Sequence, residues 1–232
     1  MKKQLFHGSD HIIETPIYGV GKKHNDYGQG FYCTEDIALA KEWAVSEEKD
    51  GYVNEYEIET NGLHILNIND GSFTLLHWMG LLLNNRAFVL ATPLEREAKR
   101  YITDCFPVPL AGVDVIIGYR ADDSYTQVIE AFLLNQINIE EIKKLFYKGS
   151  LGNQIFLKSQ KAFKQIEWKD AWQVYKDESD VTADFHARRE VNQFFSARNR
   201  AILLEGFEVP GITVRTAMGK FLIYHQEGDF YE

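Results

Sequence analysis

The sequence is poor in cysteine and has no long hydrophobic run. Two cysteines among 232 residues, Cys33 and Cys105, are too few for a disulfide framework, so we expect reduced thiols in a cytoplasmic protein. The longest apolar run, at 73–83, is too short to cross a bilayer and contains a histidine, which predicts a buried helix and no membrane partner. No apolar segment follows the N-terminal lysines, so no signal peptide is expected.

The chain also lacks common signatures of metal and nucleotide chemistry. Its 7 histidines show none of the spacings with cysteine or carboxylate residues that are typical of metal sites. No P-loop, serine-hydrolase elbow, internal repeat or low-complexity segment is present. The net charge of -9 argues against a protein that grips long duplex nucleic acid over its whole surface. The net charge does not exclude a small-molecule site or a local basic patch.

Aromatic residues, in contrast, are abundant. They make up 13 % of the chain, and aromatic rings both fill protein cores and stack on bases and nicotinamide rings. Predicted strands and helices interleave without the regular spacing of a doubly wound parallel sheet, which predicts an α+β fold. Strands are expected at 3–8, 30–34, 51–59, 62–68, 112–120 and 152–160, and helices at 34–48, 72–86, 92–104, 122–135 and 138–148.

Two segments stand apart from these elements. Residues 10–30 are predicted to form a loop, because Pro16 and several glycines punctuate them. Residues 166–232 are predicted to be a helix-rich C-terminal extension, packed on or beside a first domain at 1–165. The extension includes a predicted helix at 181–204, whose arginines fit either a phosphate-binding patch or a solvated helix face: Arg188, Arg189, Arg198 and Arg200.

Two short stretches of the first domain carry a resemblance. They read "LFHGS" at 5–9 and "YGQGFYCTED" at 27–36. Together they resemble the first two motifs of the ADP-ribosyltransferase superfamily, in the branch with a His-Tyr-Glu signature that includes diphtheria-type toxins and the poly(ADP-ribose) polymerases. The polymerases carry His-Gly-Ser or His-Gly-Thr on strand one and Gly-x-Gly-Ile-Tyr-Phe on strand two. Residues 1–165 also resemble an uncharacterised bacterial family of unknown function that is grouped with these enzymes.

The resemblance implies a fold and a set of ligand contacts. The fold is a split β-sandwich of two small antiparallel sheets with flanking helices, and NAD, the co-substrate, lies in the cleft between the sheets. On the first motif, His7 bonds the ribose on the adenosine side of NAD, the Gly8 backbone pairs with the nicotinamide carboxamide, and Ser9 is a further ribose contact. A glycine suits this role because no Cβ holds the flat ring away. Taken alone, His7 also fits a histidine at a strand end.

The second motif implies an aromatic clamp on nicotinamide. Tyr32 packs against the ring, and Trp43, which stands 11 positions on, closes a sandwich. Ala40 and Ala44 share a helix face with Trp43 and are expected to leave room for a planar ligand. Ala40 also stands where the polymerases usually have a serine, so one carboxamide contact is missing. Taken alone, Trp43 also fits a core residue.

The third motif of the superfamily is a glutamate, which this chain lacks. Residues 152–159 resemble the polymerase pattern Asn-Glu-Tyr-Ile-Val-Tyr, with Gln154 at the glutamate position. A carboxylate there stabilises the oxocarbenium-like transition state that forms when the nicotinamide–ribose bond breaks. Gln154 can bond a ribose hydroxyl but carries no charge. Substitute carboxylates are Asp122, Asp123 and Glu130, although the aspartates also fit helix N-caps.

The resemblance also implies roles for two loops. The resemblance puts the loop at 10–30 over the adenosine and pyrophosphate, where Lys22, Lys23 and His24 could meet the phosphates. Solvated loop charges are the alternative for these lysines. The loop at 146–152 corresponds to the one that selects the acceptor in the superfamily.

The resemblance therefore implies a mono-ADP-ribosyltransferase, a glycosyltransferase that moves ADP-ribose from NAD to a macromolecular acceptor, protein or nucleic acid. Catalysis is assigned to His7, Tyr32 and Gln154. The toxins in the superfamily make a toxin role, with an antitoxin as partner, part of the expectation. Two alternatives stay open: a catalytically weak NAD- or ADP-ribose-binding module, favoured by Gln154, and an NAD-dependent RNA phosphotransferase, a relative that also lacks the glutamate.

Overall fold

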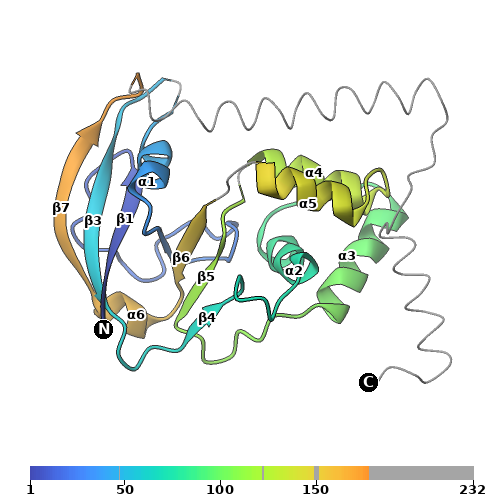
Figure 1. Ribbon diagram of the computed structural model, residues 1–232, viewed down its shortest axis with the longest axis horizontal. Helices are drawn as coiled ribbons and strands as arrows, with labels where there is room; N and C mark the ends of the chain where they lie inside the picture. The colour runs from blue at the N-terminus through green and yellow to red at the C-terminus, as the bar shows by residue number, and fades with distance from the viewer. Residues whose placement is uncertain (47, 122, 149–151, 178–232) are drawn as a thin grey trace.

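The computed structural model describes residues 1–177 except 47, 122 and 149–151, and these form two β-sheets and a layer of helices (Figure 1). The first sheet has three antiparallel strands, in the order β1 (Lys2–Ser9), β3 (Gly51–Glu59) and β7 (Ile166–Val174). The second sheet has four, in the order β2 (Phe31–Cys33), β6 (Asn153–Leu157), β5 (Val115–Tyr119) and β4 (Ile65–Asn67). The predicted α+β class with two small sheets is confirmed.

One strand pair departs from the antiparallel arrangement that was predicted. β4 and β5 run parallel to each other. A parallel pair requires a long crossover connection, and here α2 (Leu75–Asn85) and α3 (Pro93–Cys105) form it. The apolar run at 73–83 lies mostly in α2, whose residues from Trp78 to Leu83 are buried, as predicted.

Buried side chains form distinct cores on the two faces of the second sheet. Val115 and Ile116 are neighbours on β5, and they point into different cores, because side chains alternate along a strand. Val115 joins the core between the two sheets. Ile116 joins a larger core under α2, α3, α4 (Asp123–Leu133) and α5 (Ile139–Lys148), which lie on the side of the second sheet away from the first (Figure 1).

Helix α1 (Ile37–Ala44) approaches β1 closely because a glycine lies beneath it. A Cβ on Gly8 would collide with the carbonyl oxygen of Ala40 and with the Cβ of Trp43. Ala40 and Ala44 are buried in a core that they share with apolar residues of β1, β3 and β7. The space that these alanines were predicted to leave for a ligand is therefore filled by the first sheet.

Helix α1 starts later than the helix that was predicted at 34–48. Asp36, rather than Thr34, is the N-cap, and its carboxylate accepts a hydrogen bond from the Ala38 amide at 2.9 Å. The Thr34 hydroxyl donates instead to the carbonyl of Asn153 at 2.9 Å. Thr34 thus fastens the end of β2 to β6, and α1 starts two residues later than a Thr34 cap would allow.

Two elements were not predicted, namely α6 (Gln160–Lys164) and β7. β7 lies in the segment expected to be helix-rich, but it pairs with β3 along its whole length. The first sheet therefore continues past the predicted domain boundary at residue 165. The predicted helix at 181–204 and its arginines lie outside the described residues.

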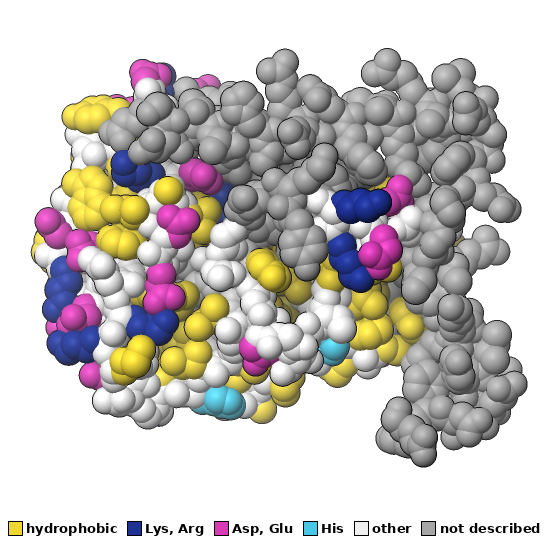
Figure 2. Space-filling model, in the orientation of Figure 1, with side chains coloured by type: hydrophobic (Ala, Val, Ile, Leu, Met, Phe, Trp, Pro, Cys, Tyr) yellow, Lys and Arg dark blue, Asp and Glu magenta, His cyan; other side chains and the backbone are white. Residues whose placement is uncertain are grey.

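Charged side chains cover the exposed part of the first sheet. Lys2 pairs with Glu57 at 2.6 Å, and Lys169 lies 3.5 Å from Glu57 and 3.0 Å from Glu167. Figure 2 shows lysine, arginine and acidic side chains side by side at the left edge of the view, where Figure 1 places these strands. Among the described residues, no helix is both long and apolar enough to cross a bilayer.

Candidate functional site

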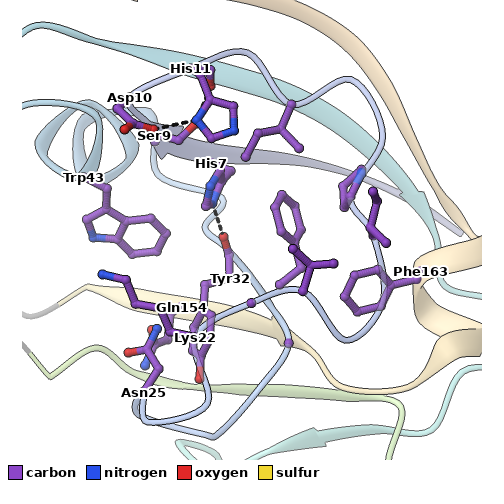
Figure 3. Close-up of a pocket in the computed structure, with 18 of the residues that line it drawn as sticks. His7, Ser9, Asp10, His11, Lys22, Asn25, Tyr32, Trp43, Gln154 and Phe163 are labelled. Carbon is purple, nitrogen blue, oxygen red and sulfur yellow. Dashed lines mark hydrogen bonds and ion pairs between the residues drawn. The ribbon is translucent and has the colours of Figure 1, made fainter.

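One cavity of about 900 Å³ lies beside the loop at 10–30 and the strands β1, β2 and β6. Its volume falls in the range of roughly 300–1,000 Å³ that is usual for ligand pockets. Figure 3 shows side chains from these distant segments arranged around one space. The residues that the three motifs assign to NAD all line this cavity: His7, Gly8, Ser9, Tyr32, Trp43 and Gln154.

His7 joins the two sheets through its imidazole ring. Its Nδ1 lies 2.6 Å from the carbonyl oxygen of Tyr32, and its ring packs against Phe31 with the centroids 4.5 Å apart. Burial lowers the pKa of His7 to about 4, so the ring is neutral at neutral pH. A carbonyl oxygen can only accept, so Nδ1 carries the hydrogen and Nε2 keeps its lone pair. His7 therefore offers the cavity an acceptor.

Tyr32 offers the cavity its ring rather than its hydroxyl. The hydroxyl donates to the carbonyl of Gly28 at 2.7 Å and accepts from the Tyr27 amide at 2.9 Å. The ring lies against Phe156 with the centroids 4.7 Å apart. Tyr32 thus fastens the end of the loop at 10–30 to β2, and its hydroxyl is already occupied within the protein.

Ser9 is engaged at the start of the same loop. Its hydroxyl donates to the carbonyl of His11 at 2.7 Å and accepts from Nδ2 of Asn54 at 3.0 Å. Asn54 is fully buried, and its Oδ1 accepts from the Ile13 amide at 2.7 Å. Ser9 and Asn54 therefore hold the first turn of the loop. Toward a ribose, the Ser9 hydroxyl could only accept a hydrogen bond, which the ribose hydroxyl would donate. Sequence reasoning missed Asn54, which looks like one more polar residue on β3.

Trp43 faces the cavity with an arginine over its ring. The Arg120 guanidinium lies 5.9 Å from the ring centroid, and its Nη1 lies 3.2 Å from a carboxylate oxygen of Glu42. Asp122, one of the candidate substitute carboxylates, lies outside the described residues. Trp43 and Tyr32 line one cavity, but Arg120 leaves only one face of the indole for a planar ligand. The Trp43 Nε1 is buried without a hydrogen-bond partner.

Gln154 is buried at the start of β6, with only 3 % of its surface exposed. Its Nε2 donates to Oδ2 of Asp26 at 2.8 Å and to the carbonyl of Tyr119 at 3.0 Å. Both partners are acceptors, so the amide orientation is fixed, and Oε1 is the atom with acceptor capacity left for a ligand. Gln154 therefore lines the cavity from the start of β6, and its amide is held by a carboxylate.

Asp26 is the functional candidate that sequence reasoning missed. Its carboxylate is 2 % exposed, lines the cavity, and accepts from the Ala121 amide at 2.8 Å as well as from Gln154. The Nε of Arg86 lies 3.0 Å from Oδ1. Burial raises the pKa of Asp26, and the Arg86 charge partly offsets this effect. A single aspartate in a glycine-rich loop carries no sequence signal for this role.

Other candidates from the sequence are less well placed. Lys22 lines the cavity, whereas Lys23 and His24 are exposed and are not among its lining residues. Glu130 lies on α4, where burial and the charge of Glu95 raise its pKa. It therefore belongs to the helical layer. The side chain of Asp123 and the centre of the loop at 146–152 lie outside the described part of the chain.

Metal and thiol chemistry gain no support from the described residues. Within that part of the chain, no group of three or more histidine, cysteine or acidic side chains could hold a metal ion. Cys33 and Cys105 are free thiols. Burial raises the pKa of Cys33 far above that of an ordinary thiol, so it stays protonated and unreactive.

A family model described as "protein of unknown function (DUF3990)" matches residues 3–168. The chain belongs to the DUF3990 family. The predicted resemblance to an uncharacterised family is confirmed at this level. The match spans every residue that lines the cavity. Comparison with curated proteins and with solved structures gave no match.

Proposed function

We propose that this DUF3990 protein is a mono-ADP-ribosyltransferase that takes NAD into the cavity and transfers ADP-ribose to a macromolecular acceptor. The observation that carries the proposal is the gathering of His7, Tyr32, Trp43 and Gln154 around one cavity. These residues lie on four different elements and match, in order, the motif positions of the superfamily that the sequence resembles. A set of unrelated core residues would have no reason to meet at one cavity.

The lining of the cavity suits the parts of a dinucleotide. Phe31, Phe163 and Tyr32 present aromatic surface, which binds planar rings by stacking. The Nε2 of His7 is an acceptor for a ribose hydroxyl. Lys22 is an exposed cation on the lining and suits a pyrophosphate. The proposal therefore accounts for both the apolar and the polar parts of the wall.

The proposed reaction breaks the bond between the ribose C1′ and the nicotinamide nitrogen. The bonding electron pair goes to the pyridinium ring, so nicotinamide leaves as a neutral molecule and positive charge develops at C1′. A nucleophilic atom of the acceptor forms the new bond to C1′ and releases its proton. Gln154 can hold a ribose hydroxyl through Oε1, which orients the sugar for this displacement.

A second candidate function follows from the neutrality of Gln154. An amide provides no full charge for the cationic transition state, so the same cavity could bind NAD or ADP-ribose without turning it over. This binding-module alternative predicts NAD affinity without release of nicotinamide. The transferase proposal predicts both NAD affinity and release of nicotinamide.

The test uses the whole protein and NAD labelled in its adenylate half. The protein is incubated with the labelled NAD and a cell lysate, and labelled product is then digested separately with nuclease and protease. His7→Phe keeps a ring of similar size but removes the acceptor, so we expect it to lose labelling. The exposed His24→Gln is the matched control and should label as the wild type does. If the protein binds NAD but labels no acceptor, the binding module is favoured. If it neither binds NAD nor labels an acceptor, the proposal is overturned.

A further inference from the structure

We infer that Asp26 supplies the negative charge that Gln154 lacks, so that the two side chains act together as the acidic element of the site. This inference rests on the proposed function, because it assigns Asp26 a part in NAD cleavage. Asp26 does not itself meet the substrate in this arrangement. It is a positioning residue that acts through Gln154.

The hydrogen bonds of Gln154 give the pair a defined direction. Its two N–H groups point at Oδ2 of Asp26 and at the carbonyl of Tyr119. The amide is not expected to flip, because a flipped Oε1 would face two acceptors and both hydrogen bonds from Nε2 would be lost. Oε1 is therefore kept as an acceptor for a ribose hydroxyl, which is one of the two tasks of a glutamate at this position.

Charge on Asp26 strengthens that acceptor. A hydrogen bond from an N–H to a carboxylate is charge-assisted, and it polarises the amide so that electron density shifts toward Oε1. Asp26 is almost fully shielded from water. Its field is therefore screened less than that of a surface carboxylate. Positive charge that develops at C1′ near Gln154 would be stabilised by this dipole, which is the second task of the glutamate.

The other contacts of Asp26 favour its charged form, against the burial that raises its pKa, and they fix its orientation. Oδ1 faces Arg86, which follows α2, while Oδ2 faces the Ala121 amide and Gln154. Oδ1 of Asp26 thus forms the ion pair with Arg86, and Oδ2 accepts the hydrogen bond from Gln154. The same contacts would also suit a purely structural role, in which Asp26 only anchors the loop at 10–30. The test therefore has to separate a role in catalysis from a role in anchoring the loop.

The contact between Asp26 and Gln154 also determines the expected effect of Gln154→Glu on NAD cleavage. A glutamate at this position would place a second carboxylate within hydrogen-bond distance of Asp26 and beside the carbonyl of Tyr119. Two buried carboxylates this close cannot both ionise, so one takes up a proton. Gln154→Glu alone is therefore not expected to raise NAD cleavage. The swap Asp26→Asn with Gln154→Glu restores one amide and one carboxylate, with the charge now on β6.

The experiment measures kcat and KM for NAD cleavage, NAD binding and urea unfolding for the wild type and four variants. We expect Asp26→Asn to lower kcat by about 100- to 1,000-fold with KM nearly unchanged, as for removal of a preorganised polar group. The swap should recover most of that loss. Gln154→Met, which leaves the Asp26–Arg86 pair in place, should lose kcat as Asp26→Asn does. Asp104→Asn removes an exposed carboxylate on α3 and should behave as the wild type.

The outcomes separate this inference from the proposed function. If the wild type neither binds nor cleaves NAD, the proposed function fails and this inference fails with it. If the wild type cleaves NAD and Asp26→Asn keeps its kcat, only this inference is overturned. It is also overturned if Asp26→Asn and the swap lose kcat, NAD binding and stability in parallel, because a structural anchor predicts that pattern. If Asp26→Asn fails to fold, full activity of Gln154→Met overturns the inference.

Discussion

The Nδ1 of His7 lies 2.6 Å from the carbonyl oxygen of Tyr32, and this contact joins the edge strand β1 of one sheet to the edge strand β2 of the other. It fixes the tautomer of His7, while burial keeps the ring neutral. It also links the first two motif positions directly, through the side chain of His7 and the backbone of Tyr32. Several properties of the protein follow from this contact and its neighbours.

The stability of the fold should depend on pH through His7. Its pKa is about 4 in the folded protein against an ordinary value of 6.5, so the unfolded chain takes up a proton first as the pH falls. Stability should therefore fall between pH 6.5 and pH 4 by at most roughly 3 kcal/mol from this group, and this group should have no effect above pH 6.5. Urea unfolding at a series of pH values measures this dependence.

A variant pair isolates the contribution of His7 to that profile. His7→Gln should flatten the decline between pH 6.5 and pH 4, whereas the exposed His24→Gln should leave it as in the wild type. An unchanged slope in His7→Gln would show that other groups cause the decline.

Gly8→Ala should destabilise the protein through helix α1. The added Cβ would meet the backbone of Ala40 and the Cβ of Trp43, so the helix must shift, and such overpacking typically costs about 1–3 kcal/mol. Gly71→Ala is the control, because Gly71 has a φ of +90° and open space around it. It should cost about 1 kcal/mol, from backbone strain alone. Equal losses in thermal unfolding would contradict the close approach at Gly8.

Tyr32 variants should separate stability from ligand binding. Tyr32→Phe removes the bonds to Gly28 and Tyr27, so we expect the free energy of unfolding to fall by about 1–3 kcal/mol. NAD affinity should change little, because the ring remains. Tyr32→Leu removes the ring and should weaken NAD binding by about 1–3 kcal/mol. Calorimetry of both variants makes the comparison, and equal losses of affinity would argue that the ring does not stack on the ligand.

The buried ion pair should matter far more to folding than the surface pairs. Asp26→Ala removes the buried carboxylate that pairs with Arg86, and breaking a buried pair typically costs about 3–5 kcal/mol. Lys2→Ala breaks an exposed pair with Glu57 and should leave the urea midpoint nearly unchanged. If the two variants unfold at the same urea concentration, the Asp26 pair is not a determinant of stability.

Local patterns were enough to predict many elements and the positions that meet at the cavity. The helix predicted at 92–104 agrees with α3, which begins with a capping box between Thr92 and Glu95. His7 and Tyr32 were singled out by short motifs, and both line the cavity. Their roles toward NAD stay predictions.

What the sequence could not predict depends on partners that are distant along the chain. Asp26 acquires its role from Gln154, 128 residues away, and no local spacing reports that contact. β7 lies in a segment that was predicted to be helix-rich, and its pairing partner β3 is distant along the chain. Thr34 and Asp36 are both good N-cap residues, and only the bond from Thr34 to Asn153 decides between them.

The anchoring of Asp26 has a consequence for local unfolding. Asp26 ties the end of the loop at 10–30 to Arg86 beyond α2, and Tyr32 holds the amide next to it. This end of the loop cannot open without breaking bonds to the helical layer and to β2. The Tyr27 and Gly28 amides should therefore exchange their hydrogens as slowly as those of α2, although they belong to a loop. Rapid opening would be confined to the exposed stretch around Ile17, which leaves one end of the cavity rigid while the other admits ligand.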